Sequence, residues 1–290
     1  MITKQLQSKI DYSIQLIRKA EKTALRYRPE GFFVAFSGGK DSQVLLKLTQ
    51  LAGVHYTAEH NLTTIDPPEN VHFIKKHYPD VVIVRPRLTF WALCRHHKMM
   101  PTQWTRFCCK DLKEAANAHA VTLTGVRRSE SARRSSRQEI YLQTRRRHPE
   151  FTQGTFDQFT RYQESTVECL RGLDKLTVNP ILDWSEKDVW DFIHHYDIPI
   201  NPLYEKGYRR VGCICCPMSN IKSIQREVND YPKYYAAYLR LIHRIREAKR
   251  AQPEGDIWED LTDEEVFWAW AKKQGPRNAV AEKHQASFDF

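Results

Sequence analysis

The sequence lacks any long apolar run. A membrane-spanning helix needs about 20 apolar residues in succession, and the best stretch in these 290 residues, Gly31 to Phe36, is far shorter. Met1 to Lys9 also lack the apolar core of an export signal. The apolar residues near this end recur at helical spacing instead: Ile2, Leu6, Ile10, Ile14 and Ile17. We therefore expect an amphipathic helix over residues 1–26 and a cytoplasmic protein that binds no membrane.

Structural disulfides are not expected either. The sequence has seven cysteines, but cytoplasmic thiols stay reduced, so we predict free thiols or metal ligands. Positive charge is plentiful, because 45 Lys and Arg residues face 35 Asp and Glu residues, a net charge of +10. That surplus permits an anionic partner such as a nucleotide, a nucleic acid or an acidic protein face. Many ordinary domains carry a similar excess with no such partner.

Short apolar runs alternate with helical periodicity over the first two-thirds of the chain. Strands are predicted at 32–36, 54–58, 81–84, 121–126 and 178–181, with helices at 41–52, 68–78, 88–97 and 107–119. This rhythm predicts an α/β fold with a doubly wound, mostly parallel sheet. The loops that follow the first, second and fourth strands should then share one crevice. Beyond residue 217 the pattern is helical, at 231–250 and 262–273.

The segment Ser37-Gly38-Gly39-Lys40-Asp41-Ser42 lies between a predicted strand and a predicted helix. Its glycines allow a phosphate to approach the backbone, and a helix N-terminus supplies N–H donors and partial positive charge. It is not a Walker loop, because Val34 stands where the first glycine is required and Asp41 where a Ser or Thr is required. The alternative is a tight turn that binds nothing.

These six residues resemble the PP-loop of the N-type ATP pyrophosphatases, and their surroundings resemble the PAPS reductase-like branch, named for phosphoadenosine phosphosulfate. The resemblance runs from Tyr27 to Met218. It includes the stretches Thr64–Glu69, Gly125–Ser131, Asn179–Trp184, Asn201–Tyr204 and Gly212-Cys213. It implies an adenine nucleotide alpha hydrolase-like fold that binds ATP or a sulfonucleotide.

The resemblance also implies a chemistry and its residues. In ATP-using members the loop holds the pyrophosphate, Mg²⁺ offsets phosphate charge, and an oxygen nucleophile takes AMP from ATP. Lys40 and Asp41 are then the predicted catalytic residues of the loop. The predicted nucleotide-binding residues are Ser37, Gly38, Gly39, Lys40, Asp41, Ser42, Asp66, Gly125, Arg127, Arg128 and Arg133.

The cysteines form a distinct pattern. Cys108 and Cys109 are adjacent, and Cys213 and Cys216 form a CxxC motif. Four thiolates suffice for zinc or for a [4Fe–4S] cluster, and the spacing leaves both open. The same arrangement in PAPS reductase-like proteins implies a [4Fe–4S] cluster. Cys215 is a spare ligand or a sulfur carrier, which makes it a third catalytic candidate, whereas Cys94 and Cys169 are interpreted as packing residues.

One departure from the family pattern concerns a missing thiol. Sulfonucleotide reductases place a catalytic cysteine in a short C-terminal motif, and no cysteine follows Cys216 here. What remains is adenylation plus a cluster, as in enzymes that insert sulfur. The Asp66-Pro67-Pro68-Glu69 segment resembles the sulfur-transfer subunits of DNA phosphorothioation systems more than the reductases.

Arginines are concentrated between Arg127 and Arg147, where eight arginines face two glutamates, a local surplus of six positive charges. Arginine favours bidentate contact with phosphate. The first of these belong at the crevice; the predicted contacts to a nucleic-acid backbone are Arg134, Arg137, Arg145, Arg146 and Arg147. The alternative is solvated surface charge.

The combined prediction has three domains: an N-terminal helix over 1–26, a nucleotide-binding and cluster domain over 27–217, and a helical region over 218–290. Its function is adenylation of an acceptor oxygen for sulfur insertion into nucleic acid, DNA before transfer RNA, with ATP, Mg²⁺ and a [4Fe–4S] cluster. A cysteine desulfurase and other subunits of a modification complex are the expected protein partners. The alternatives are a sulfonucleotide reductase and a non-catalytic nucleotide- or DNA-binding subunit.

Overall fold

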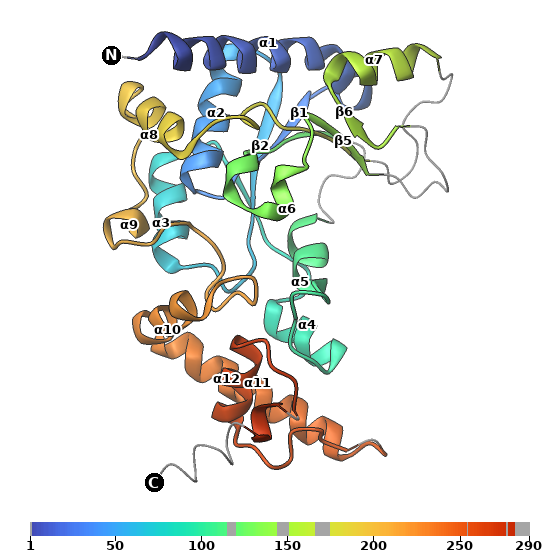
Figure 1. Ribbon diagram of the computed structural model, residues 1–290, viewed down its shortest axis with the longest axis vertical. Coiled ribbons are helices and arrows are strands. Elements are labelled where there is room, and N and C mark those ends of the chain that lie inside the picture. The colour runs from blue at the N-terminus through green and yellow to red at the C-terminus, as the bar shows by residue number, and fades with distance from the viewer. Residues whose placement is uncertain are drawn as a thin grey trace. The chain divides into compact units, whose positions relative to one another are not determined.

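The structure is a computed structural model. It describes residues 2–114, 120–143, 151–165, 175–253, 255–276 and 278–281. The chain forms two compact units (Figure 1). Unit 1 comprises residues 1–61, 68–84 and 115–211, and unit 2 comprises residues 62–67, 85–114 and 212–290. Among the described residues, no helix has both the length and the apolar character needed to cross a membrane.

Unit 1 is built on a seven-stranded sheet in the order β3-β2-β1-β4-β7-β5-β6. Its strands are β1 (Phe32–Ala35), β2 (Tyr56–Asn61), β3 (Val82–Val84), β4 (Val121–Leu123), β5 (Ile140–Gln143), β6 (Gln153–Gly154) and β7 (Lys175–Val178). The pairs that join β1, β2, β3, β4 and β7 are parallel, whereas β5 pairs antiparallel with β7 and β6. The predicted α/β fold with a mostly parallel sheet is confirmed.

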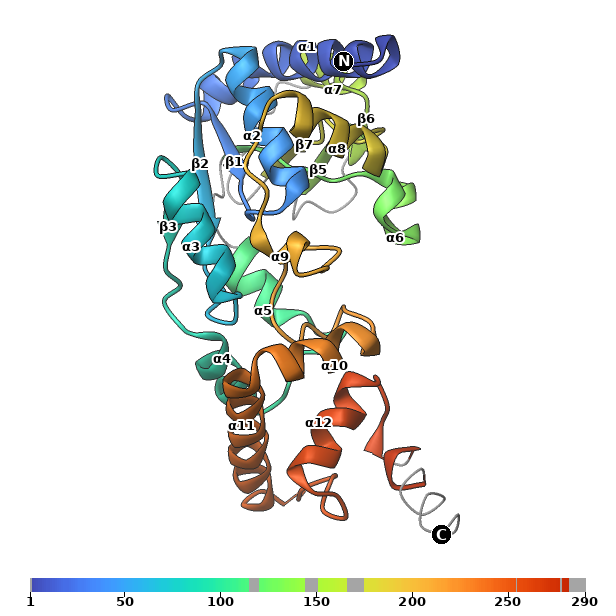
Figure 2. The ribbon, with the colours of Figure 1, turned by 90° about the vertical axis from the view of Figure 1, so that its left-hand side faces the viewer.

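The helices of unit 1 are α1 (Lys4–Tyr27), α2 (Lys40–Ala52), α3 (Pro68–His77), α6 (Ala132–Ser135), α7 (Phe156–Ser165), α8 (Glu186–His195) and α9 (Pro202–Glu205), with a 3-10 turn η2 (Arg128–Glu130). Figure 2 shows α1 lying along the end of the unit beside α2. Leu6, Ile10 and Ile17 on α1 are almost fully buried. The amphipathic pattern of the first residues therefore becomes one face of the unit 1 core.

The predicted strands differ from the structure in several places. β2 begins at Tyr56 rather than at residue 54, because Gly53 ends α2 in a left-handed conformation and a linker follows. The fifth predicted strand lies three residues earlier, as β7. Strand β5 was not predicted, since Ile140–Gln143 lies inside the arginine-rich segment and pairs with a strand more than 30 residues away. The antiparallel edge of the sheet depends on that long-range pairing.

Unit 2 is helical apart from its loops. It contains α4 (Phe90–His97), α5 (Phe107–Cys109), a π-helical turn η1 (Lys110–Glu114), α10 (Ile221–Asp230), α11 (Pro232–Arg250) and α12 (Asp263–Ala271). The helix predicted over 107–119 is thus a short helix and a π turn up to Glu114, and residues 115–119 lie outside the described part. Tyr238 is fully buried and packs against Phe90, Phe267 and Trp270. The predicted domain boundaries at 26/27 and 217/218 stay a prediction.

Candidate functional site

The phosphate loop, Ser37 to Ser42, joins the buried strand β1 to α2. Its N-cap residue, Gly39, offers no side chain to the N–H groups of the first turn of α2, so they depend on other partners. Gly38 has a φ of +76°, and a Cβ there would lie 2.2 Å from Asn70 Oδ1. Ser42 Oγ accepts a hydrogen bond from Ser37 N at 3.1 Å and donates one to the Gly39 carbonyl at 2.8 Å. The loop is therefore a fixed turn in which Gly38 must be glycine.

Two buried asparagines hold this loop from behind. Asn201 Nδ2 donates to the Gly38 carbonyl at 3.0 Å and to Asn70 Oδ1 at 2.8 Å. Asn70 Nδ2 donates to the Ser37 carbonyl at 3.0 Å. Sequence analysis missed both roles, although Asn201 opens one of the stretches that carry the family resemblance. The contacts join residues more than 30 and more than 130 positions apart, which no local pattern predicts.

Lys40 lies at the start of α2 and is almost fully buried. Its Nζ lies 3.5 Å from Asp41 Oδ2, 3.6 Å from Glu186 Oε1 and 5.5 Å from the ring centre of Tyr204. The backbone N–H of Lys40 donates to the Tyr204 hydroxyl at 2.9 Å. Burial raises the pKa of Tyr204, so its hydroxyl stays neutral. An ammonium flanked by two carboxylates thus stands at the helix N-terminus where a phosphate would bind.

Arg127 brings the loop after β4 to the same place. Its buried guanidinium donates from Nε to Asp41 Oδ1 at 2.6 Å and from Nη1 to Ser129 Oγ at 3.0 Å. A Cβ on Gly125 would lie 2.8 Å from the Asp41 carbonyl, so that loop also passes close to α2. The structure therefore brings together the phosphate loop, Gly125 and Arg127, as the crevice argument predicted for the first and fourth strands.

Further positive charge surrounds Asp41. The pKa of Arg134 is lowered, first by burial and then by the positive charge of Arg210. The charges of Arg137 and Arg127 lower it further, and the negative charge of Asp41 raises it. Arg134 also pairs with Glu130 one helical turn away. Arg210 was not predicted, because it lies in a loop that no motif marks. Arg134 therefore lies within electrostatic range of Asp41 and of three other arginines, a concentration of positive charge suited to an anion.

The remaining predicted nucleotide- and nucleic-acid-binding residues have other partners, lie in unit 2 or are not described. Arg128 pairs with Asp183 and donates to the Arg137 carbonyl at 3.0 Å, so its guanidinium braces two loops. The guanidinium of Arg137 lies 4.9 Å from the ring centre of Tyr141. Of Arg133 only the backbone is described, and Arg145, Arg146 and Arg147 lie outside the described residues. Asp66 belongs to unit 2.

The predicted metal ligands lie in unit 2. The pKa of Cys109 is lowered to about 5, and the main cause is the hydrogen bond that the Cys108 thiol donates to the Cys109 sulfur. Burial opposes this shift, whereas a hydrogen bond from Arg106 adds to it. The same contact raises the pKa of Cys108, and the charges of Cys109, Cys216 and Cys213 add to that rise. The adjacent pair and the CxxC pair are therefore close enough to interact electrostatically, as the spacing of the motifs alone could not show.

Cations and loop residues complete this thiol cluster, by which we mean Cys108, Cys109, Cys213 and Cys216. The charge of Cys213 raises the pKa of Lys113, which burial opposes, and the Lys113 ammonium is hydrogen-bonded to the Cys213 sulfur. Cys213 Sγ also lies 3.5 Å from Thr63 Oγ1. The negative charge of Asp66 also raises the pKa of Lys113. Asp66 Oδ2 accepts a hydrogen bond from Thr63 N at 2.6 Å. Asp66 therefore shapes the loop at the thiol cluster.

The donor chemistry of the thiol cluster suits a soft metal or an iron–sulfur group. Thiolates are its preferred ligands, and the positive charges of Arg106 and Lys113 stabilise them. Within the part of the chain that the structure describes, however, no group of three or more His, Cys, Asp or Glu side chains is arranged at metal-binding distances. The residue types thus suit such a group, whereas their arrangement in the structure is that of interacting thiols.

Cys215 differs from its neighbours. It is fully buried, and burial followed by the charge of Glu227 raises the pKa of its thiol. Its backbone φ of +52° lies in the left-handed region, and its N–H donates to Glu227 Oε2 at 2.6 Å. These features give no support to its predicted role as sulfur carrier. Cys94 is buried with a pKa raised to about 12, as expected of a packing residue, and Cys169 lies outside the described residues.

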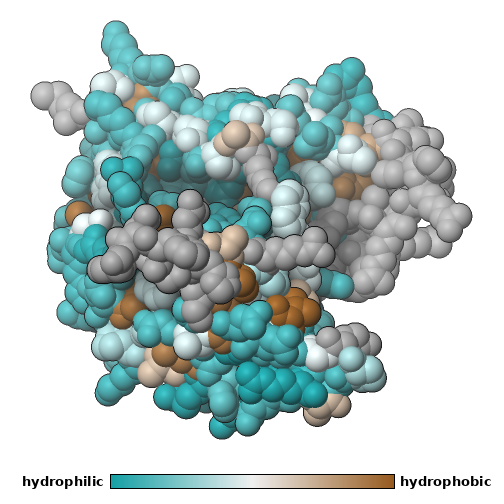
Figure 3. All heavy atoms as spheres, turned by 60° about the horizontal axis from the view of Figure 1, so that its bottom comes forward, coloured by the Kyte–Doolittle hydropathy of each residue, from teal (hydrophilic) through white to brown (hydrophobic). Residues whose placement is uncertain are grey.

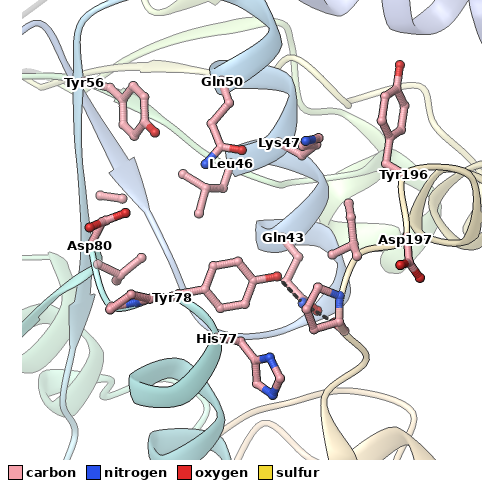
Figure 4. A pocket seen from close by; sticks show the side chains of 15 residues that line it. Gln43, Leu46, Lys47, Gln50, Tyr56, His77, Tyr78, Asp80, Tyr196 and Asp197 are labelled. Atoms are coloured by element: carbon pink, nitrogen blue, oxygen red, sulfur yellow. Dashed lines mark hydrogen bonds between the residues drawn. The ribbon is translucent and has the colours of Figure 1, made fainter.

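A separate cavity of about 270 Å³ opens in unit 1 between α2, the end of α3 and the segment after α8. Figure 4 shows Gln43 and Tyr78 joined at its floor, where Gln43 Nε2 donates to the Tyr78 hydroxyl and to the Pro199 carbonyl, both at 2.6 Å. Its lining includes none of the predicted site residues. The cavity is therefore not the phosphate site.

Comparison with known proteins decides the family. The family model of the phosphoadenosine phosphosulfate reductase domain matches residues 31–219. The chain belongs to this family. The match includes the phosphate loop, Arg127 and all four cysteines of the thiol cluster. It thus confirms the predicted PAPS reductase-like, nucleotide-binding family.

Individual relatives are more distant. The chain is 26% identical to the uncharacterized protein MJ0066 of Methanocaldococcus jannaschii over 83% of this chain and 46% of that protein. It is 47% identical to adenosine 5'-phosphosulfate reductase of Allochromatium vinosum, but over only 17% of this chain and 18% of that enzyme. The chain spans about half the length of the first curated relatives it matches.

Among solved structures, phosphoadenylyl-sulfate reductase from Candida auris, in a phosphate complex, is 15% identical, with a TM-score of 0.44 over 73% of this chain and 96% of that one.

Proposed function

We propose that this protein is a PP-loop ATP pyrophosphatase that adenylates an acceptor oxygen for sulfur insertion into nucleic acid, with DNA phosphorothioation as the favoured reaction. The observation that carries the proposal is the phosphate loop with two carboxylates at Lys40. Asp41 and Glu186 lie 3.5 and 3.6 Å from Lys40 Nζ. MgATP brings a hard cation that one or two carboxylates suit, which favours MgATP over a sulfonucleotide alone.

In this proposal the residues of unit 1 bind and orient ATP. The N–H groups at the start of α2 and the Lys40 ammonium bind the phosphates that leave as pyrophosphate. Arg127 neutralises Asp41 when no nucleotide is bound, and the cluster of arginines stabilises charge on the α-phosphate. The acceptor oxygen forms a bond to the α-phosphorus of ATP. At the same time the bond between the α-phosphorus and the oxygen that bridges to the β-phosphate breaks, and pyrophosphate leaves. A sulfur nucleophile at the oxidation level of sulfide then displaces AMP.

A [4Fe–4S] cluster is part of the proposal for unit 2. Cys108, Cys109, Cys213 and Cys216 would hold it, and it would supply sulfur-binding or redox chemistry there. Arg106 and Lys113 offset the negative charge of the thiolates. The sulfur itself would come from an external donor, for which a cysteine desulfurase is the natural class of partner. Anaerobically purified protein should contain about four irons per chain, and zinc in their place would contradict this part of the proposal.

The decisive experiment for the enzyme measures pyrophosphate and AMP formed from ATP in the presence of oligonucleotide acceptors. Lys40→Ala should lower kcat/KM about 100-fold or more, because an ammonium that stabilises transferred phosphate is lost. Lys47→Ala, seven residues further along α2 in the lining of the separate cavity, is the matched control and should retain activity. If wild-type protein forms no pyrophosphate with any acceptor, the proposal fails.

A second candidate is a reductase of a sulfonucleotide. It is favoured by the family itself and by the short, 47% identical match to a reductase. Reduction of adenylyl sulfate or its 3'-phosphate by the protein with a dithiol donor, without any use of ATP, would establish this candidate in place of the first.

A further inference from the structure

Unit 2 presents an exposed tryptophan on a tightly bonded turn. Trp104 is 79% exposed. Thr102 Oγ1 accepts hydrogen bonds from Trp104 N at 3.2 Å and from Thr105 N at 2.9 Å, and Thr102 N donates to the Thr105 carbonyl at 3.1 Å. Trp270 Nε1 donates to the Pro101 carbonyl at 2.6 Å, which fixes the turn to α12. The turn thus holds a large aromatic ring with most of its surface exposed to solvent.

The segment around this turn is strongly basic. Between Arg85 and Glu114 seven Lys and Arg residues face two acidic residues, a surplus of five positive charges in 30 residues. Six of the seven are exposed and are not bonded to Cys213: Arg85, Arg87, Arg95, Lys98, Arg106 and Lys110. Part of this charge, Arg95 on the last turn of α4, also complements the helix dipole. Lys98, Arg106 and Lys110 are not explained in that way.

The basic segment folds back on itself next to the thiol cluster. The His97 ring at the end of α4 lies 4.2 Å from the ring of Phe107 in α5, centre to centre. Arg106, two residues after Trp104, is the N-cap residue of α5 and hydrogen-bonds Cys109. The exposed ring, the positive charges and the thiols therefore belong to one continuous piece of unit 2. We call residues 98–110 the Trp104 platform.

We propose that the Trp104 platform binds single-stranded nucleic acid, with a base stacked on Trp104 and the backbone phosphates on Lys98, Arg106 and Lys110. An exposed aromatic ring can stack on a base only where that base is unstacked, as in a single strand and not in a duplex. The flanking cations suit the phosphate backbone. Hydrophilic side chains predominate on the face in Figure 3, and apolar side chains form only small separate patches there. The positive charges of the platform itself favour an anionic partner over an apolar protein face.

This inference rests on the proposed function, because it assigns the place where the acceptor would bind near the thiols. The test measures fluorescence anisotropy of a labelled single-stranded oligonucleotide with full-length wild-type protein and variants. Trp104→Ala should weaken binding about tenfold and Trp104→Phe by less, because phenylalanine keeps a stacking face. Lys110→Ala should reduce the slope of log K against log salt by about 0.7, the share of one phosphate contact. Ile257→Ala, an exposed apolar residue elsewhere in unit 2, and Lys19→Ala on α1 are the matched controls and should bind as wild type.

The two failures are distinguishable. Trp104-dependent oligonucleotide binding by a protein that forms no pyrophosphate would support the platform and contradict the enzyme. Equal binding by wild type and Trp104→Ala would overturn the platform, whatever the activity. A Trp104→Ala variant that binds the oligonucleotide normally but no longer self-associates would assign the ring to an interface between copies and would also overturn it.

Discussion

At the scale of single residues, the phosphate loop depends on two buried asparagines that bond to its backbone carbonyls. Asn201 is fully buried, and its side-chain amide donates hydrogen bonds to the Gly38 carbonyl and to Asn70 Oδ1. Asn70 in turn holds the Ser37 carbonyl. These bonds hold two carbonyls of the loop, while the N–H groups of Ser37 and Lys40 donate to Ser42 Oγ and to the Tyr204 hydroxyl.

Replacement of Asn201 should therefore damage both stability and binding. Asn201→Ala leaves a buried carbonyl and a buried amide without their donor, which should cost about 1–3 kcal/mol of unfolding free energy. ATP affinity should fall as well. Urea unfolding and calorimetric titration with ATP measure the two effects. Asn229→Ala, at an exposed position of α10, should change unfolding by less than about 0.5 kcal/mol. Equal stability of the two variants would show that the asparagine bridge is dispensable.

At the scale of elements, α2 has a positive-φ glycine at each end. Gly38 precedes the helix with φ +76°, and Gly53 caps its C-terminus with φ +68°. The two differ in space: a Cβ at Gly38 would strike Asn70, whereas nothing lies within 4 Å of one at Gly53. The same substitution at the two sites thus separates backbone strain from steric exclusion.

Gly53→Ala should cost about 1–2 kcal/mol, the price of a left-handed backbone alone. Gly38→Ala should cost clearly more and should also abolish tight nucleotide binding, because the loop or Asn70 must move. Thermal unfolding and ATP titration of both variants provide the comparison. If Gly38→Ala bound ATP like the wild-type protein, the loop would not be the rigid cradle described above.

Helix α8 contributes a pH-dependent link to α1. Asp188 accepts from Lys9 Nζ at 2.6 Å and from the backbone of Ser185 at 2.7 Å. Burial raises the pKa of Asp188, but these bonds outweigh it and the pKa is lowered below its ordinary 3.8. The Asp188 carboxylate is therefore protonated at a higher pH in the unfolded chain than in the folded chain. The stabilisation that its ionised form gives the fold is complete above the ordinary pKa. It is lost as the pH falls through the lowered one.

Asp188→Ala should therefore cost about 1 kcal/mol in urea unfolding at pH 7 and pH 5, as for a lost cap, and less at pH 3. Lys187→Ala, which removes an exposed pair with Asp191 on the same helix, should cost less than about 0.5 kcal/mol. A cost of Asp188→Ala that stayed constant down to pH 3 would contradict the assigned pKa shift.

The sequence predicted the elements whose cause is local. Ser37–Ser42 was found because strand, glycines and helix start are adjacent, and the parallel sheet followed from alternating runs. Strand β5 and the partners Asn70, Asn201 and Tyr204 depend on contacts across the chain, and no short pattern encodes them. The four cysteines were grouped by motif, but only the structure brings Lys113, Arg106 and Asp66 to them.

At the scale of the whole molecule, phosphate loop and thiol cluster belong to different compact units with separate cores. The core of unit 1 surrounds its sheet, and that of unit 2 surrounds Tyr238. On the proposed function, the two chemistries are thus divided between two bodies of one chain.

Removal of the proposed metal should act on one unit. Chelation of anaerobically prepared protein should remove its iron and lower the melting temperature, since metal bound only by the folded state stabilises that state. ATP affinity should be retained. Cys213→Ala should reproduce the loss of iron, and Cys94→Ala should keep it. Full iron content in Cys213→Ala would exclude this cysteine as a ligand.

Unit 2 is assembled from three separate stretches of chain, so the polypeptide passes from one unit to the other five times. A single proteolytic cut at any of the three inner crossings would leave each fragment with pieces of both units, and a cut at the first or the last crossing would leave one fragment with only part of one unit. Neither unit can be obtained by simple truncation, and a recombination event that exchanges one contiguous segment cannot transplant the thiols without part of the nucleotide fold. A segment that carries all four cysteines of the thiol cluster necessarily carries residues 115–211 of unit 1 with them.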